Sequence, residues 1–307
     1  MFLKIYLMQK SGISKIANYL KDQIKLDYNL SKNSWFGIGG NSSIFFQPKN
    51  KEALKYFLLN YKIKKNIIIG SGSNILFKET NNKDIVIKLG PGFTNIKEIN
   101  GKIFAESAAL KSKVSEFALK NSYSKFEFMS CIPGTIGGGV IMNAGCFGSE
   151  FSDVIEEVYA ITLNGDEIIL KKSEIKFEYR KSNINENLII LGVLFAKTKK
   201  TNSDKILEKI NILKSKKKKN QPSSIKTGGS TFKNPTYATS LKAWQLIKKY
   251  NCDTLRFGKA KYSSKHCNFI DNTEKASSEE IEQLIKETQK KIFLQSGIKL
   301  ELEIKII

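Results

Sequence analysis

The chain has 307 residues, 41% of them hydrophobic, which is enough to bury the cores of two domains. No stretch approaches the roughly 18 apolar residues of a membrane-spanning helix, and no secretory leader is recognisable, so we expect a cytoplasmic protein. The formal net charge of +22 comes almost entirely from lysine, with Arg180 and Arg256 as the only arginines. Nucleic-acid-binding proteins more often carry clustered arginines among aromatic residues, so we expect small anionic ligands such as nucleotides.

The N-terminal third predicts short helices and strands in succession. Hydrophobic spacing predicts helices over 13–24 and 51–60, and residues 34–48 form a glycine turn that leads into a strand. The β-branched run at 67–69 predicts a buried strand. It ends in the loop GSGSN (Gly70 to Asn74), whose small hydrogen-bonding residues are typical of a phosphate-binding turn.

The stretch from Phe128 to Glu150, FMSCIPGTIGGGVIMNAGCFGSE, is dense in glycine. Glycine at this density favours neither helix nor strand, but it allows tight bends and close approach of a ligand. Consecutive backbone N–H groups in such a loop can bind phosphate, although the stretch has neither a Walker motif nor GxGxxG spacing. The residues alone leave a phosphate-binding loop and a packing turn equally open.

The rest of the chain is also mixed. Asn164-Gly165 lies between two apolar runs and predicts a β-hairpin over 154–170. Ser277 and Glu280 form a capping box that opens a helix reaching 293, and the strict alternation over 300–306 predicts a final strand. Further strands are predicted at 85–89, 102–105 and 188–196, and further helices at 109–119, 204–213 and 241–250.

The cysteines and the single histidine narrow the possible chemistry. Cys131, Cys146, Cys252 and Cys267 show no CxxC motif and no zinc-ligand spacing, so we expect free thiols and no bound metal. His266 is the only histidine, which leaves no Ser-His-Asp triad elsewhere in the chain.

Three polar positions are candidates for catalysis. Arg180, beside Tyr179, could bind a carboxylate through two parallel hydrogen bonds, which lysine cannot do, although a surface pair is the commoner arrangement. Ser230 follows two glycines in KTGGSTFKNP and lacks a neighbouring base, so it is a poor nucleophile and a better hydrogen-bond donor. Glu301 and Glu303 fit the outer face of the final strand.

Taken together, the motifs resemble the UDP-N-acetylenolpyruvoylglucosamine reductase family, flavoenzymes that complete UDP-N-acetylmuramate for peptidoglycan. The chain is similar to the shorter type of the family, which lacks an inserted loop in the substrate lobe. The resemblance covers nearly the whole chain from about residue 30, with the motifs in the family's order and spacing: SWFGIGGNS, IIGSGSNILF, SCIPGTIGGGVIMNAGCFG, FEYRKSNI, KTGGSTFKNP, SSKHCNF and LELEIKI.

The resemblance implies an α+β fold of the vanillyl-alcohol-oxidase (PCMH) type, in which two subdomains hold FAD non-covalently and a C-terminal α+β lobe binds substrate. We expect an N-terminal helical segment over 1–30, an FAD-binding domain over 31–200 with subdomains of about 31–90 and 91–200, and a substrate-binding domain over 201–307. The implied FAD contacts are Gly70, Ser71, Gly72, Ser73, Asn74, Ile132, Pro133, Gly134, Thr135, Gly137, Gly138, Asn143 and Gly145.

The resemblance also implies the reaction. NADPH would reduce the flavin, and the flavin N5 would deliver hydride to C3 of UDP-N-acetylglucosamine enolpyruvate. Arg180 and Glu303 would stabilise charge on the substrate carboxylate, and Ser230 would protonate C2. Tyr179 and Asn234 would position the substrate. The implied partners are the UDP-sugar and NADPH, with no nucleic acid and no membrane, and the enzyme is expected to be a monomer.

Two other functions remain open at this point. A different FAD-linked oxidoreductase of the same fold, such as an oxidase, would be reoxidised by air and would not respond to NADPH. A basic RNA-associated protein without catalysis would be colourless and would bind RNA with a steep salt dependence. The glycine loops and the scarcity of arginine argue against the RNA-associated protein.

Overall fold

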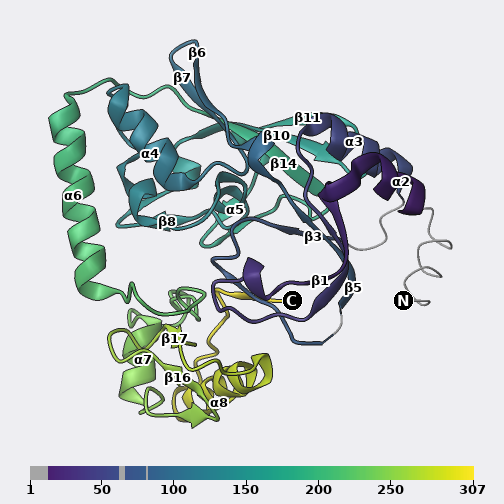
Figure 1. The fold of residues 1–307 in the computed structure, drawn as a ribbon. Helices are drawn as coiled ribbons and strands as arrows, with labels where there is room; N and C mark the ends of the chain where they lie inside the picture. Colours follow the sequence, from purple (N-terminus) through teal and green to yellow (C-terminus); the bar gives the residue numbers. More distant parts are fainter. Residues whose placement is uncertain (1–12, 62–65, 81) are drawn as a thin grey trace. The chain divides into compact units, whose positions relative to one another are not determined.

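The structure is a computed structural model that describes residues 13–61, 66–80 and 82–307 (Figure 1). The described chain divides into two compact units whose segments interleave in the sequence. Unit 1 takes its residues from 1–28, 42–70 and 83–213, and unit 2 from 29–41, 71–82 and 214–307. The GSGSN loop is therefore divided, because Gly70 belongs to unit 1 and Ser71 begins a segment of unit 2.

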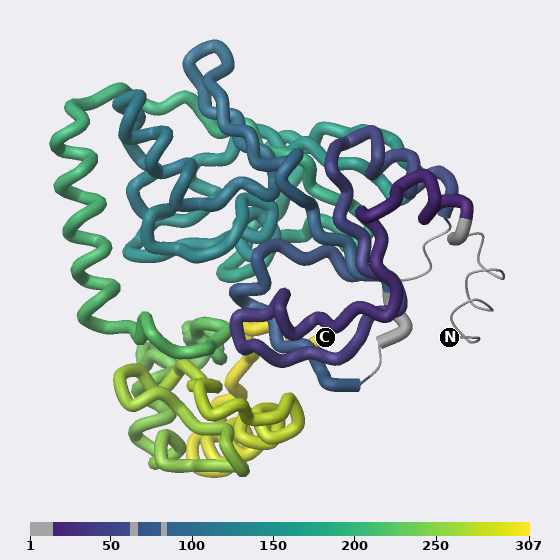
Figure 2. Tube along the Cα trace, in the orientation of Figure 1, coloured from purple at the N-terminus to yellow at the C-terminus, as the bar shows by residue number. Residues whose placement is uncertain are grey.

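The first sheet of unit 1 has the strand order β1-β2-β5-β3, and β3 and β5 run parallel. Helices α2 and α3 lie side by side, with the Tyr19 and Tyr56 ring centroids 4.1 Å apart (Figure 2). Their apolar faces form a core with the sheet around Phe46, Leu54 and Phe57. The bounds are α2 Ile13–Leu20, β1 Ile24–Asn29, β2 Asn41–Phe46, α3 Lys51–Asn60, β3 Asn66–Ile69 and β5 Asn82–Lys88.

The helix predicted over 13–24 is shorter in the structure. It ends at Leu20, a 3-10 turn covers Lys21–Gln23, and strand β1 starts at Ile24. The sequence of β1 alternates inward and outward residues, with Ile24 buried and Lys25 exposed. Because a strand neighbour in the sheet can satisfy the backbone here, the chain leaves the helix before its apolar pattern ends.

The second sheet of unit 1 is five-stranded and antiparallel, in the order β11-β10-β14-β7-β6. The Asn164-Gly165 turn joins β10 to β11, which confirms the predicted hairpin, and β6 and β7 project as a second hairpin (Figure 1). Helices α4 and α5 contribute Val114, Ala118 and Val140 to the core of this sheet. The bounds are β6 Ile96–Ile99, β7 Lys102–Glu106, α4 Lys111–Lys120, α5 Ile136–Ile141, β10 Ile155–Thr162, β11 Glu167–Lys171 and β14 Leu188–Phe195.

Two short hairpins and a long helix complete this part of the chain. Strand β8, Gly145–Cys146, pairs with β9, Ser149–Glu150, and strand β12, Phe177–Glu178, pairs with β13, Lys181–Ser182. Helix α6, Ser203–Asn220, begins in unit 1, where Lys209 Nζ lies 3.4 Å from the carboxylate of the buried Glu127.

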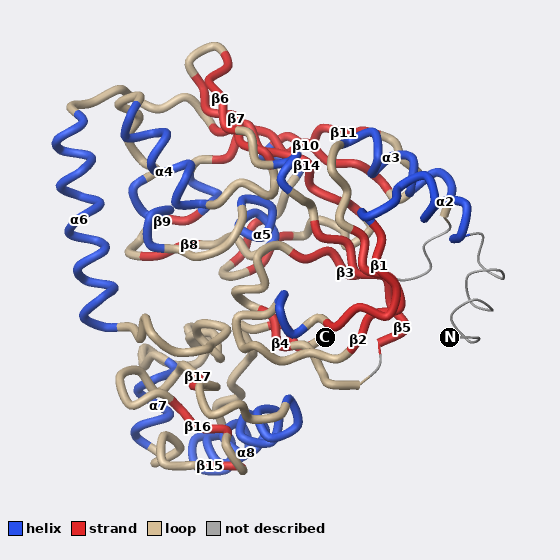
Figure 3. The backbone as a smooth tube through the Cα atoms, viewed as in Figure 1, coloured by secondary structure: helices blue, strands red, loops and turns tan. Residues whose placement is uncertain are grey.

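Unit 2 contains a three-stranded antiparallel sheet in the order β15-β16-β17 and the helices α7 and α8 (Figure 3). Its core gathers Phe232, Leu246 and Leu284. The capping box predicted for α8 is confirmed, because Ser277 Oγ accepts from the Glu280 N–H and Glu280 accepts from the Ser277 N–H. The bounds are α7 Ala243–Lys249, β15 Arg256–Phe257, β16 Ala260–Tyr262, β17 Ile270–Asp271 and α8 Ser278–Ser296.

The chain end of unit 2 pairs with the segment that follows the GSGSN loop. Strand β18, Lys305–Ile306, runs parallel to β4, Ile75–Leu76. The predicted alternation is present in the burial, since Leu300 and Ile304 are buried and Glu301 is exposed. The regular strand is shorter than predicted, because the residues before Lys305 make isolated bridges and single hydrogen bonds instead of a continuous ladder.

Candidate active site

The GSGSN loop approaches the second glycine-rich loop inside unit 1. A Cβ atom built on Gly70 would lie 2.4 Å from Thr135 Oγ1, a separation that real side chains do not reach. In unit 2, Gly72 has a φ of +72°, and a Cβ there would lie 1.8 Å from the Asn33 carbonyl oxygen. Both positions therefore require glycine, because the neighbouring atoms leave no room for a side chain.

The second loop lies between a 3-10 turn at Glu127–Cys131 and helix α5. Its amides are partly engaged by the protein itself: the Ile136 N–H donates to the Ala109 carbonyl and the Gly137 N–H to the Ser107 carbonyl, both at 2.9 Å. These two groups are not available to a phosphate. If the Ile132–Gly138 segment binds phosphate through its backbone, it must do so through N–H groups other than those of Ile136 and Gly137.

One atom of the GSGSN loop, in unit 2, is suited to a polar ligand. The Ser71 hydroxyl oxygen is buried and has no hydrogen-bond partner among the described residues. Buried polar groups are nearly always satisfied, so such an atom calls for a ligand or water. The close approach at Gly70 and Thr135 brings the backbones of the two loops together within unit 1.

Arg180 occupies the turn of the β12–β13 hairpin in a strained conformation. Its φ is +59°, which is uncommon for a side chain of this size and is typical of functional positions. One nitrogen, Nη2, donates to the Gly145 carbonyl at 2.9 Å, and the guanidinium carbon lies 4.9 Å from the centroid of the Tyr179 ring. The two contacts fix the plane of the guanidinium in unit 1.

Asn143 supports the same hairpin. Its side chain is fully buried, its Nδ2 donates to the Glu178 carbonyl at 3.1 Å, and its Oδ1 accepts from the Ser152 N–H at 3.0 Å. Asn143 and Gly145 thus both contact the Arg180 hairpin. Their implied contact with the cofactor stays a prediction.

Ser230 and Glu303 come together in unit 2 although they are far apart in the sequence. The Glu303 N–H donates to the Thr231 carbonyl at 2.9 Å, and Phe232 forms a β-bridge with Leu302. Ser230 itself forms an antiparallel bridge with Phe269. Both side chains are half-buried. The backbone thus holds a hydroxyl and a carboxylate on adjacent segments.

Asn268 stabilises the Ser230 segment through hydrogen bonds, a role that the sequence did not indicate. Its side chain is 4% exposed and makes a two-way contact with Phe232, accepting from the Phe232 N–H at 3.0 Å and donating to the Phe232 carbonyl at 2.9 Å. Its own carbonyl accepts from the Thr231 N–H at 2.7 Å. The motif SSKHCNF contains this residue, and the motif was the only available signal.

His266, in the same motif, is neutral in this setting. Burial lowers the pKa of its imidazole, and its Nδ1 accepts from the Asn268 N–H at 3.3 Å, which requires an unprotonated nitrogen. Burial also raises the pKa of the Cys267 thiol to about 11, so this cysteine is not a nucleophile at neutral pH.

The structure therefore distributes the predicted residues over the two units. In unit 1 it brings Tyr179 and Arg180 to Gly145, and Gly70 to Thr135. In unit 2 the Thr231 carbonyl, one residue after Ser230, accepts from the Glu303 N–H, and Asn234 Oδ1 accepts from the Ala243 N–H at the start of α7 at 3.1 Å.

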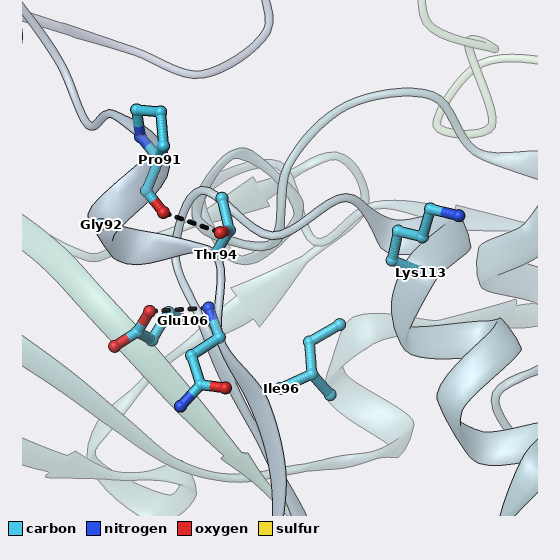
Figure 4. A pocket seen from close by; sticks show the side chains of 7 residues that line it. Pro91, Gly92, Thr94, Ile96, Glu106 and Lys113 are labelled. Carbon is cyan, nitrogen blue, oxygen red and sulfur yellow. Dashed lines mark hydrogen bonds between the residues drawn. The ribbon is translucent and has the colours of Figure 1, made fainter.

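A groove of about 790 Å³ on unit 1 is a separate feature (Figure 4). Thr94 Oγ1 donates to the Pro91 carbonyl and the Asn95 N–H donates to Glu106, each at 2.7 Å. None of the predicted site residues lines it. Within the described chain no helix could cross a membrane, and no cluster of His, Cys, Asp and Glu could hold a metal ion.

Comparisons with known proteins match both parts of the chain. Residues 42–171 match the "FAD binding domain" family model, and residues 221–307 match the model of the "UDP-N-acetylenolpyruvoylglucosamine reductase, C-terminal domain". The match to an FAD-binding domain agrees with the buried Ser71 hydroxyl, which lacks a hydrogen-bond partner among the described residues. The α+β, FAD-binding fold that the sequence implied is confirmed.

Relatives and a solved structure agree with the family models. The UDP-N-acetylenolpyruvoylglucosamine reductase of Pelagibacter ubique is 44% identical over 98% of this chain and 100% of its own length. That of Rickettsia massiliae is 43% identical over 95% of this chain and 98% of its own length. The crystal structure of the enzyme from Thermus caldophilus aligns with a TM-score of 0.78 at 27% identity, covering 92% of this chain and 97% of its own. The chain belongs to the UDP-N-acetylenolpyruvoylglucosamine reductase family, the FAD-dependent oxidoreductases also called UDP-N-acetylmuramate dehydrogenases.

Proposed function

We propose that the chain uses NADPH to reduce UDP-N-acetylglucosamine enolpyruvate, with Ser230 as the proton donor and Arg180 and Glu303 as the groups that act on the substrate carboxylate. The observation that supports this most is the backbone pairing that holds Ser230 and Glu303 on adjacent segments of unit 2. We further propose that the enzyme acts as a cytoplasmic monomer, built from the N-terminal segment, FAD-binding domain and substrate-binding domain that the sequence implies.

The two glycine-rich loops would hold the cofactor. Ser71, with its buried and unsatisfied hydroxyl, and Thr135, opposite Gly70, would contact the pyrophosphate. The glycines of both loops would let the dinucleotide come close to the backbone. FAD, when bound, supplies the hydride for C3 of the enolpyruvyl group.

Arg180 would stabilise negative charge on the substrate carboxylate. Its guanidinium is already held by the Gly145 carbonyl and by the Tyr179 ring, so little reorganisation is needed when charge develops. Preorganised donors of this kind contribute on the order of 100-fold in rate each. Glu303 would donate a hydrogen bond to the same carboxylate when its own carboxyl group carries a proton, and Tyr179 and Asn234 would position the substrate.

Ser230 would deliver a proton to C2. A serine hydroxyl is a weak acid, so it works only when it is rigidly aimed at a strongly basic carbon. The segment is held by Asn268 on one side and by the Glu303 backbone on the other, which provides this rigidity.

The test separates the two half-reactions by stopped-flow absorbance in Ser230→Ala. We expect flavin reduction by NADPH to stay within about 2-fold of the parent rate, and reoxidation by the enolpyruvyl substrate to fall by roughly three orders of magnitude, as for the loss of a positioned acid. A variant that is reoxidised at the parent rate would remove Ser230 from the mechanism.

A further inference from the structure

Asn74 links the GSGSN loop to the final segment through one hydrogen bond to Glu303 and one from Lys305. Its Nδ2 donates to the Glu303 carbonyl oxygen at 2.9 Å, and its own carbonyl accepts from the Lys305 N–H at 2.9 Å. The carboxamide therefore contacts the protein at the position where the resemblance implies a cofactor-binding residue. All three residues belong to unit 2.

The contact is continued by regular pairing on its C-terminal side. Ile75 lies opposite Lys305 and Leu76 opposite Ile306 in the parallel β4–β18 pair, and the Ile307 N–H donates to the Leu76 carbonyl at 3.0 Å. The GSGSN loop and the final segment thus form one hydrogen-bonded structure.

The Glu303 peptide is held from two sides. Its N–H donates to the Thr231 carbonyl, in the segment of Ser230, and its carbonyl accepts from Asn74, in the GSGSN loop. Only a side chain with a donor can reach this carbonyl from the loop, and an aspartate would place a charged oxygen against it. The amide of asparagine is thus required by the contact.

We propose that Asn74 is a positioning residue for Glu303, which couples cofactor binding at the GSGSN loop to the placement of the Glu303 carboxylate. The effect on catalysis rests on the proposed function, in which Glu303 acts on the substrate carboxylate. The coupling rests on the proposed assignment of the GSGSN loop to FAD and on the hydrogen bonds of Asn74 to Glu303 and Lys305.

The first measurement tests the coupling between FAD binding and the position of Glu303 in the absence of catalytic turnover. Hydrogen exchange of a peptide covering residues 299–307 is compared with and without FAD. We expect FAD to slow exchange in the parent protein, and we expect this slowing to be lost in Asn74→Ala and in the isosteric Asn74→Asp when each variant is measured at an FAD concentration that saturates it. Slowing that persists in both variants would overturn the coupling.

The second measurement reports on catalysis in the FAD-loaded enzyme. We expect reoxidation by UDP-N-acetylglucosamine enolpyruvate to fall about 10-fold or more in Asn74→Ala, because a misplaced catalytic group costs this much, and to fall by a larger factor than reduction by NADPH, which does not use the Glu303 carboxylate. In the Glu303→Gln background, Asn74→Ala should cause no further loss. Equal losses in both half-reactions, or losses that multiply in the double variant, would show a merely structural role and overturn the proposal.

Asn121→Ala is the matched control. Asn121 Nδ2 donates to the Phe117 carbonyl at 2.8 Å, also in a part-buried setting, but at the end of α4 in unit 1. The Asn121→Ala variant loses the same kind of side-chain hydrogen bond to a backbone carbonyl. We expect both half-reactions and the FAD-dependent hydrogen exchange to stay unchanged in it. If Glu303→Gln alone is reoxidised at the parent rate, the assignment of Glu303 fails, and the hydrogen-exchange result still decides the coupling.

Discussion

Two distinct contacts hold the guanidinium group of Arg180 in place. The group donates to the Gly145 carbonyl and stacks over the Tyr179 ring, while its backbone is held at a positive φ. A lysine could provide the charge but not the planar fork, whose fixed geometry suits bidentate binding of a carboxylate.

We therefore expect Arg180→Lys to be nearly as damaging as Arg180→Ala, with kcat reduced on the order of 100-fold in both. Steady-state kinetics at saturating NADPH measure this. Arg256→Lys is the control, because Arg256 is exposed on β15 and should tolerate the change. Full activity in Arg180→Lys would show that the fork geometry has no role.

The identity of this residue was accessible from the sequence, but its setting was not. Arg180 attracted attention because arginine is so rare in the chain, and the hairpin around it is local. The hydrogen bond from Arg180 to the Gly145 carbonyl joins residues 35 positions apart. It depends on how two short hairpins pack together, which a local sequence pattern does not predict. The same is true of Asn74 and Glu303, 229 residues apart.

The element that fixes the proposed acid is the segment around Ser230. It has no regular strand of its own, and its bridges and hydrogen bonds come from Phe269, Asn268 and the final segment. Asn268 is the central member, because one buried side chain satisfies both backbone groups of Phe232.

We expect Asn268→Ala to lower the free energy of unfolding by about 2–3 kcal/mol, because it leaves a buried N–H and a buried carbonyl of Phe232 without their partner. Urea unfolding followed by circular dichroism measures the change. Asn60→Ala, which removes an exposed bond to the Tyr56 carbonyl on α3, should cost less than about 0.5 kcal/mol. Equal costs in the two variants would show that the two hydrogen bonds between the Asn268 side chain and the Phe232 backbone are not important for stability.

Elements with strong local signals were predicted well, and elements that depend on distant partners were not. The Asn164-Gly165 hairpin and the α8 capping box are set by a few adjacent residues, and both are confirmed. The final strand was predicted longer than it is, because alternation reports burial and not the length of the ladder. The helix over 13–24 was overextended because its apolar pattern continues into β1.

At the scale of the molecule, the two compact units draw on interleaved segments. Residues 29–41 and 71–82 join the C-terminal part of the chain, and the change in composition near residue 200 carries no sign of this. The family's motif order indicated the fold through resemblance, whereas local patterns indicated only mixed α and β structure. Long-range assembly of this kind is set by tertiary packing.

Two buried acidic groups of unit 2, the Cys267 thiol and the Tyr262 hydroxyl, make the free energy of unfolding depend on pH in the alkaline range. Burial raises the pKa of Cys267 to about 11 and raises that of Tyr262 as well, so the unfolded chain loses these protons first. Because the unfolded state then binds fewer protons, the free energy of unfolding falls as pH rises, and this contribution is complete below the ordinary thiol pKa.

Between pH 9 and about 11, we expect Cys267 to contribute a loss of at most about 1.4 kcal/mol per pH unit. Urea unfolding of the parent and of Cys267→Ala across this range isolates the thiol, because all other groups are shared. The variant should show a shallower decline. Parallel curves would mean that the thiol does not titrate differently in the two states.

The most direct test of the whole account is the visible absorbance of the purified protein under anaerobic conditions. We expect a bound flavin spectrum that NADPH bleaches and that UDP-N-acetylglucosamine enolpyruvate restores in stoichiometric amount. A colourless protein that binds no added FAD, or a reduced flavin that only oxygen reoxidises, would contradict the account.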